Sequence, residues 1–194
     1  GKAILVYGLG KLGSATAKAL IDAGASVVVG DDHADRLSEL VEYGAQSLDI
    51  DHADFSNFAF LLLSPGIPLT HPEPHHVVKL AKDAAIEILC DIELFSRIYP
   101  DLKTIGVTGT NGKSTTVTLI THILNSCGRH ALLGGNIGTP VFSLNVEDEE
   151  DTYLVVEMSS FQIDLCPEFR PDIAVILNLT PDHLDRHGSM ENYM

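Results

Sequence analysis

The stretch "GVTGTNGKSTT", residues 106–116, decides the fold class of the second half of the chain. Its first residues end a short apolar run, "TIGV" at 104–107, and it leads into a segment without Gly or Pro up to residue 127. An apolar run, a glycine-rich turn and a long helical segment are typical of a phosphate-binding loop between a strand and a helix. The amide groups and the dipole at the start of such a helix attract an anion.

We expect this loop to hold a nucleoside triphosphate. Lys113 would reach the β- and γ-phosphates, and the Ser114 hydroxyl would contact Mg²⁺. The strict pattern G-x-x-x-x-G-K-[ST] has glycine where this chain has Val107, and the glycine here is at position 109 instead. The alternative is a tight turn that only caps the helix. The predicted ATP contacts are Gly109, Thr110, Asn111, Gly112, Lys113, Ser114 and Thr115.

A second glycine-rich turn, "YGLGKLGSA" at 7–15, follows the apolar run "AILVY" near the start of the chain. Gly8, Gly10 and Gly13 match G-x-G-x-x-G, and Asp31 ends the next predicted strand. This pattern predicts a dinucleotide-binding turn in which an acidic residue hydrogen-bonds a ribose. Taken alone, the pattern would suggest NAD, and a sharp turn that packs without any ligand is the structural alternative.

Apolar runs and helical segments alternate along the chain, which predicts an α/β fold with parallel sheets. We expect a Rossmann-like parallel-sheet domain at 1–96, followed by part of a P-loop-type α/β ATPase domain at 97–194. Helices are expected at Leu12–Ala23, 34–44 and Pro74–Ala84. The side chains expected to face the two cores from the helices after the glycine-rich turns are Leu12, Ala15, Ala19 and Leu20, and Leu119, Ile123 and Leu124.

The chain of 194 residues is acidic, with 27 Asp and Glu against 12 Lys and Arg and a formal charge of -15. Nucleic-acid binding needs clustered Lys and Arg, so the composition argues against it. The longest apolar run, "FAFLLL" at 58–63, is too short to cross a bilayer. The three cysteines form no C-x-x-C pair and indicate reduced thiols. We therefore expect a cytoplasmic monomer without nucleic-acid partners or membrane insertion.

Polar residues follow two further predicted strands. Glu157 ends "YLVVE", and "PDHLDRH" at 181–187, which contains His183, follows "AVILNL". Ligands of open α/β sheets bind at the carboxyl ends of strands, so a carboxylate at such an end is the expected contact for Mg²⁺. The histidines of "HPEPHH" at 71–76 lie in a proline-rich loop, which predicts a solvated loop and no metal site.

Taken together, these segments resemble the Mur ligases, the ATP-dependent amide-forming enzymes of peptidoglycan synthesis. The pieces that carry the resemblance follow the family's order over nearly the whole chain: "GLGKLG", "SPGI", "DIELF", "GVTGTNGKSTT", "GGNIG", "EMSSFQ" and "NLTPDHLDRH". "GGNIG" with "SSFQ" favours the members that add D-glutamate. The resemblance implies UDP-N-acetylmuramoyl-L-alanine and D-glutamate as substrates, with ATP and Mg²⁺ as cofactors. The substrate carboxylate would become an acyl phosphate, which the amine of D-glutamate attacks.

The resemblance also implies roles for individual residues. Lys113, Glu157 and His183 would be catalytic, and Ser114, Glu157 and His183 would ligate metal. The muramoyl group would contact Asn136, Ser159 and Gln162. The uridine diphosphate would contact Gly10, Lys11, Leu12, Asp31, Ser64, Pro65 and Gly66.

The sequence departs from the family in three ways. Lys11 stands where an apolar residue is usual, and Asp32-His33 stand where a hydroxyl and a basic side chain are usual. The family's carbamylated lysine and its amino-acid-binding domain lie beyond residue 194, so we expect an incomplete, inactive fragment. An NAD-dependent oxidoreductase and a non-catalytic nucleotide-sugar-binding module are the alternative functions.

Overall fold

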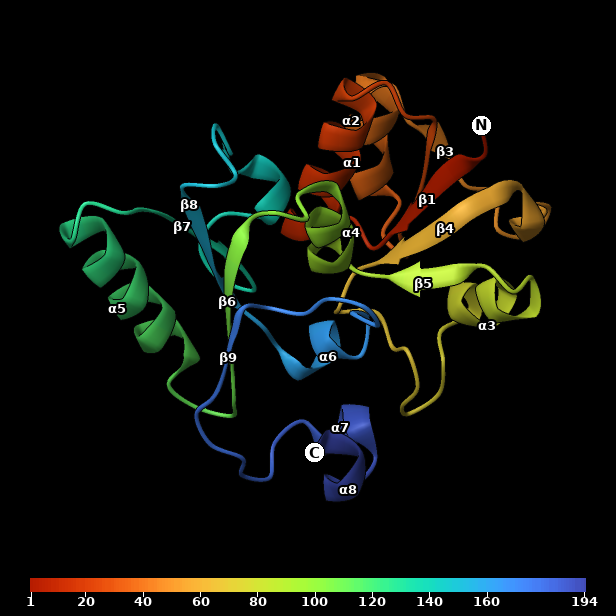
Figure 1. The fold of residues 1–194 in the computed structure, drawn as a ribbon. Helices are drawn as coiled ribbons and strands as arrows, with labels where there is room; N and C mark the ends of the chain where they lie inside the picture. The colour runs from red at the N-terminus through yellow and green to blue at the C-terminus, as the bar shows by residue number, and fades with distance from the viewer. The chain divides into compact units, whose positions relative to one another are not determined.

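The computed structural model describes residues 1–194, which form two compact units, Gly1–Asp91 and Ile92–Met194 (Figure 1). The division falls at the start of helix α4 (Asp91–Ile98), whereas the sequence placed it after residue 96. Each unit contains its own parallel sheet. The expected α/β fold class with Rossmann-like parallel sheets is confirmed.

The first unit is built on a five-stranded parallel sheet in the order β3-β2-β1-β4-β5. The central strands are buried apolar runs, as expected for a sheet covered on both faces. The strands are β1 (Ala3–Tyr7), β2 (Val27–Gly30), β3 (Gln46–Ser47), β4 (Phe58–Leu63) and β5 (Glu87–Leu89), with a short 3₁₀ helix, η1, at Phe55–Asn57.

Helices α1 (Lys11–Asp22), α2 (Asp35–Tyr43) and α3 (His76–Asp83) connect these strands. The fully buried residues of α1 are Gly13, Thr16, Ala17 and Leu20, and of the predicted face Leu12, Ala15 and Ala19 are only half-buried. Small residues on the buried face let the helix approach the glycine-rich turn, because a Cβ on Gly13 would lie 2.1 Å from the Gly8 carbonyl oxygen. Helix α3 begins at His76 instead of Pro74, because the His75 ring accepts a hydrogen bond from the Val77 amide and caps the helix there.

The second unit contains a four-stranded parallel sheet in the order β7-β8-β6-β9. Its strands are β6 (Lys103–Thr108), β7 (His130–Gly135), β8 (Thr152–Glu157) and β9 (Ile173–Ile176). The helices are α4, α5 (Lys113–Ser126), α6 (Ser160–Ile163), α7 (Leu184–His187) and α8 (Met190–Tyr193), with the 3₁₀ helix η2 at Val141–Ser143. β6 is therefore flanked on both sides, and the loop after it opens at the carboxyl edge of the sheet.

Helix α5 packs on this sheet through Val117, Ile120 and Leu124, which join the core around Ile105 and Val155. The prediction that Leu119 and Ile123 face the core was wrong, since they are 54% and 50% exposed. Residues 117, 120 and 124 lie on one side of the helix, and 119 and 123 lie on another.

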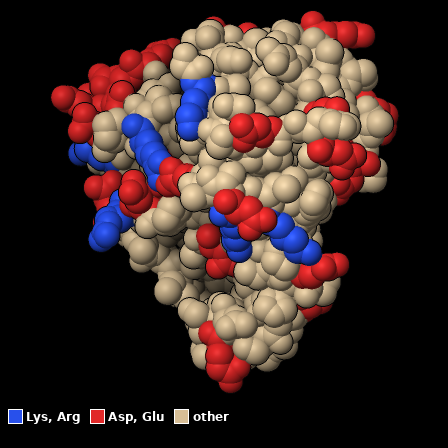
Figure 2. All heavy atoms as spheres, turned by 90° about the vertical axis from the view of Figure 1, so that its right-hand side faces the viewer, with Lys and Arg blue, Asp and Glu red and all other residues tan.

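Acidic side chains are spread over the face drawn in Figure 2, and the Lys and Arg side chains there lie beside acidic ones. The charge of -15 is therefore not offset by a broad basic patch on that face. None of the helices combines the length and the apolar character that crossing a membrane requires.

Candidate nucleotide sites

The loop between β6 and α5 has the backbone of a phosphate-binding turn. Gly109 and Gly112 have φ values of +135° and +89°, which favour glycine. Helix α5 then begins at Lys113, and no side chain caps its first turn. The first amides of a helix have no partner within it, so this end offers donors and a positive dipole end to an anion.

Lys113 lies folded over this loop. Its Nζ donates hydrogen bonds to the carbonyl oxygens of Gly109 at 2.6 Å and Thr110 at 3.0 Å. The ammonium is thus held beside the uncapped helix start by two carbonyl oxygens, and the third of its N–H groups could donate to a phosphate oxygen.

Two backbone N–H groups that we expected to bind phosphate donate hydrogen bonds within the protein instead. The Thr110 amide donates to the carbonyl oxygen of Asn178 at 3.0 Å, and the Asn111 amide donates to the Asn178 Oδ1 at 2.9 Å. The uncapped donors of this loop are therefore at the helix start, around Gly112 and Lys113.

A buried carboxylate lies next to the loop. Glu157, the last residue of β8, is only 2% exposed. Its Oε2 accepts a hydrogen bond from the Ser114 hydroxyl, and its Oε1 accepts one from the side-chain Nδ2 of Asn136, each at 2.8 Å. Parallel pairing of β6, β7 and β8 brings the three residues to one sheet edge.

This group fits a magnesium ion bound together with a nucleotide. Mg²⁺ in nucleotide sites usually takes one or two protein oxygens and completes its shell with phosphate oxygens and water. The Ser114 hydroxyl and the Glu157 carboxylate are two such oxygens in contact. No group of three or more His, Cys, Asp or Glu is placed to hold a metal. The resemblance assigned Glu157 and His183 to two different ions, so the metal role of His183 stays a prediction.

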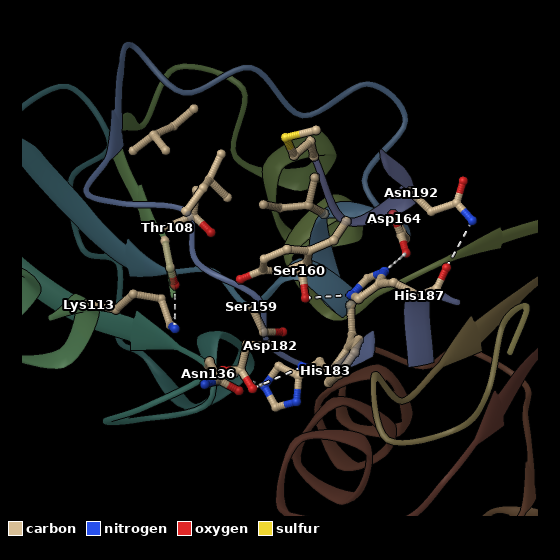
Figure 3. A pocket seen from close by; sticks show the side chains of 17 residues that line it. Thr108, Lys113, Asn136, Ser159, Ser160, Asp164, Asp182, His183, His187 and Asn192 are labelled. Carbon is tan, nitrogen blue, oxygen red and sulfur yellow. Dashed lines mark hydrogen bonds and ion pairs between the residues drawn. The ribbon is translucent and has the colours of Figure 1, made fainter. Parts of the chain in front are cut away.

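A cavity of about 500 Å³ opens beside the loop (Figure 3). It brings together Lys113, Asn136, Ser159 and His183, which come from four different segments. His183 has φ +50° and lies 3.7 Å from the Asp182 carboxylate. The cavity therefore gathers most of the predicted catalytic and muramoyl-binding residues, with Glu157 buried behind Asn136.

Ser159 and Gln162 do not share one role in the structure. Ser159 lines the cavity and caps α6, and Gln162 is fully buried. The backbone N–H of Ser159 donates to the side-chain Oε1 of Gln162 at 3.1 Å. In return, the Ser159 hydroxyl accepts from the backbone N–H of Gln162 at 3.3 Å. This reciprocal pair is a capping box, which holds Ser159 at the cavity wall.

Sequence reasoning missed a second group on the cavity wall. The buried His187 ring lies 2.8 Å from the Ser160 hydroxyl and 3.7 Å from the Asp164 carboxylate, and it stacks on Phe161 (Figure 3). Burial raises the pKa of Asp164, and the neighbouring His187 opposes this rise. The signal in the sequence was the second histidine of "DHLDRH".

In the first unit, the Asp31 carboxylate is only 3% exposed and holds the glycine-rich turn. It accepts hydrogen bonds from the Leu9 and His33 amides, and Arg36 lies 3.5 Å away. Burial alone would raise the pKa of Asp31, but these hydrogen bonds and the arginine outweigh it and lower the pKa. The carboxylate thus stabilises the turn directly.

The remaining predicted uridine diphosphate contacts meet at the same sheet edge. The Ser64 amide donates to the Tyr7 carbonyl oxygen at 2.9 Å, and a Cβ on Gly8 would lie 2.5 Å from the Ser64 Cβ. Leu12, Ser64 and Pro65 line one small gap. Gly10 has open space around it, and Lys11 is exposed at the start of α1. The structure therefore places residues 10–12 and 64–66 close to each other.

The Asp32 carboxylate joins the proline-rich loop to this edge. Its Oδ1 lies 2.7 Å from the Tyr7 hydroxyl and 3.1 Å from the His75 ring. Burial, and then the hydrogen bond to Asp32, raise the pKa of Tyr7 far above its usual range. His75 therefore contacts Asp32, the Tyr7 ring and the Val77 amide, whereas the sequence predicted a solvated loop.

Comparison with known proteins identifies the family. Residues 107–194 match the Mur ligase middle domain. The UDP-N-acetylmuramoylalanine--D-glutamate ligase of Brucella abortus (strain 2308) is 51% identical over 196 residues, which cover 99% of this chain and 42% of the relative. The chain belongs to the Mur ligase family. The Agrobacterium fabrum relative of the same name is also 51% identical, over 100% of this Mur ligase chain and 42% of its own length.

Solved structures share the fold at low identity. A UDP-N-acetylmuramate:L-alanyl-gamma-D-glutamyl-meso-diaminopimelate ligase from Neisseria meningitides has a TM-score of 0.59 at 18% identity, covering 99% of this Mur ligase chain and 65% of its own. A murein peptide ligase from Psychrobacter arcticus has a TM-score of 0.55 at 20% identity, covering 95% and 44%. These likenesses concern the fold alone.

Proposed function

We propose that this chain supplies the nucleotide-binding units of an ATP-dependent ligase that joins D-glutamate to UDP-N-acetylmuramoyl-L-alanine. The observation that carries the proposal is the uncapped start of α5, with Lys113 and Ser114 beside the buried Glu157. The names of relatives about 50% identical over this chain support the choice of substrates. These relatives are longer, since the chain spans 42% of their length, and the proposed activity is that of the whole protein.

In the proposed reaction, a carboxylate oxygen of the substrate attacks the γ-phosphorus of ATP, and ADP leaves. The neutral amine then attacks the carbonyl carbon of the acyl phosphate, the C–O bond to phosphate breaks, phosphate leaves, and the nitrogen loses one proton to water. Lys113 would hold phosphate oxygens, and the helix start would supply amides to the same charge. Magnesium, when bound, supplies positive charge between the phosphates, and Ser114 and Glu157 would hold it. Asn136 and Ser159 would orient the substrate carboxylate within the cavity, because both line it.

The first unit would hold the uridine diphosphate of the sugar nucleotide through residues 10–12 and 64–66. Asp31 would act by holding the Leu9 amide and so the shape of the turn. We propose the cytoplasm as the location of the reaction, because it supplies ATP.

Hydrogen exchange of the chain with each ligand tests this division of roles. MgATP is expected to slow exchange at residues 109–115, and UDP to slow it at 8–12 and 64–66. Protection of the first turn by MgATP, with no change at 109–115, would contradict the proposal.

A further inference from the structure

Asn178 follows β9 and contacts the phosphate-binding loop through three hydrogen bonds. Its carbonyl oxygen accepts from the Thr110 amide at 3.0 Å. Its side-chain Oδ1 accepts from the Asn111 amide, and its Nδ2 donates to the Asn111 carbonyl oxygen, both at 2.9 Å. The backbones approach so closely that a Cβ on Gly109 would lie 3.0 Å from the Asn178 carbonyl oxygen.

Lys113 contacts the same two peptide groups from their other side. The peptide between Gly109 and Thr110 donates its N–H to Asn178 and presents its C=O to the Lys113 Nζ. The peptide between Thr110 and Asn111 does the same. The N–H and C=O of a trans peptide are fixed in one plane and point in opposite directions. Asn178 therefore sets the direction of the carbonyls that hold the lysine.

The Thr110 side chain connects the loop to the segment 178–183 by hydrogen bonds. Its hydroxyl donates to the Thr180 carbonyl oxygen at 3.1 Å and accepts from the Thr180 amide at 3.0 Å. It also lies 3.0 Å from the Tyr193 hydroxyl. The loop, the chain from Asn178 to His183, and α8 are therefore connected through Thr110.

We propose that Asn178 is a positioning residue for nucleotide binding: it holds two peptides of the loop so that Lys113 and the start of α5 face the phosphates. This inference rests on the proposed function, because it assumes a triphosphate at the loop. Asn178 itself would not contact the nucleotide. Without its side chain, the peptide between Thr110 and Asn111 is free to rotate, and the lysine loses a fixed acceptor.

A purely structural role predicts a different pattern, and the chain provides a matched control. Asn125, near the end of α5, makes the same reciprocal pair with one backbone residue: its Oδ1 accepts from the Ala131 amide and its Nδ2 donates to the Ala131 carbonyl oxygen, both at 3.0 Å. Asn125→Ala removes equivalent hydrogen bonds in the same unit, at a site that does not contact the loop.

The test is calorimetric titration of MgATP into the unchanged chain, Asn178→Ala and Asn125→Ala, with melting temperatures measured in parallel. Asn178→Ser, whose side chain is too short to bridge to Asn111, is the second variant if the alanine variant does not fold. We expect similar losses of melting temperature in the two alanine variants, but MgATP affinity about tenfold weaker only in Asn178→Ala, as for loss of one oriented contact. Exchange of the Asn111 amide should quicken in that variant alone.

Equal MgATP affinities in Asn178→Ala and Asn125→Ala would overturn the inference and leave the proposed function standing. Absence of MgATP binding by the unchanged chain would overturn the proposed function, and the inference with it.

Discussion

Ser114 and Asn136 donate to different oxygens of the same buried carboxylate, that of Glu157, each at 2.8 Å. Ser114 lies in the first turn of α5, and Asn136 directly follows β7. The carboxylate therefore joins the nucleotide loop to the residue that we expect to face the substrate. Its charge and its hydrogen bonds can be tested separately.

Glu157→Gln removes the charge and preserves the contacts. The amide oxygen can accept from Asn136 while its nitrogen donates to Ser114, so we expect the melting temperature to stay close to that of the unchanged chain. The stimulation of ATP binding by Mg²⁺ should disappear, because a neutral amide is a poor ligand for a hard cation. Titrations of ATP with and without Mg²⁺ measure this difference.

Glu157→Ala is the matching variant, since it removes the acceptor of both hydrogen bonds. Ser114 and Asn136 are exposed, so water can take the place of the carboxylate, and we expect a loss of about 0.5–1.5 kcal/mol of unfolding free energy for each hydrogen bond. If Glu157→Gln kept the full Mg²⁺ effect, Glu157 would not be a metal ligand.

Gly109→Ala should destabilise the second unit. The residue has φ +135°, and its new Cβ would meet backbone atoms of Asn178 at 3.0 and 3.1 Å. We expect a loss of roughly 1–3 kcal/mol in unfolding by urea. In Gly10→Ala the new Cβ would point into open space, so its unfolding free energy should stay within about 0.5 kcal/mol of that of the unchanged chain. Equal losses at the two positions would show that the close approach of Asn178 is not the cause.

The sequence was sufficient for the sheets apart from the two-residue edge strand β3, and for the glycine-rich turns and the position of Glu157. Each of these depends on a local pattern or on the rule that ligands gather at carboxyl strand ends. The same rule applies to Asn178, which follows an apolar strand, and it could have marked this residue as a neighbour of the loop. The sequence segment "DIAVILNL" predicted a longer strand than Ile173–Ile176. The strand stops early because the chain turns toward Thr110 and Asn111.

Contacts between distant segments could not be predicted. The role of Asp31 depends on the Leu9 amide, 22 residues away in sequence. The buried side of α5 depends on where the sheet lies, and three apolar residues at helical spacing did not determine it. Helical spacing therefore predicted a buried position for Leu119 and Ile123, which are exposed.

Asp31 predicts a dependence of stability on pH. Its pKa is lower in the folded chain than in the unfolded one, so its contribution is present above an unfolded pKa of about 3.9 and is lost as the pH falls through the lower folded value. At pH 7, Asp31→Asn should have a lower unfolding free energy than the unchanged chain. Between pH 7 and pH 3 its unfolding free energy should fall less than that of the unchanged chain, as measured by urea unfolding at each pH. Asp51→Asn, at an exposed position, serves as the control. An unchanged acid slope in Asp31→Asn would contradict the assignment.

The first unit should distinguish UDP from NAD. If residues 10–12 and 64–66 bind a uridine diphosphate, UDP should raise the melting temperature, and above its Kd the rise should grow with the logarithm of the UDP concentration, since a ligand that binds only the folded state stabilises it. NAD at the same concentrations should have no effect. Stabilisation by NAD alone would favour the oxidoreductase alternative and remove the support for UDP.

The central claim is that residues 109–115 hold a triphosphate, and calorimetric titration of MgATP into the chain and its Lys113→Ala variant tests it most directly. Lys103→Ala, at the opposite end of β6, is the control because its ammonium contacts the Glu150 carbonyl and the Tyr153 ring. We predict one MgATP site that persists in Lys103→Ala and is lost in Lys113→Ala. MgATP binding that is equally strong in Lys113→Ala would contradict the account.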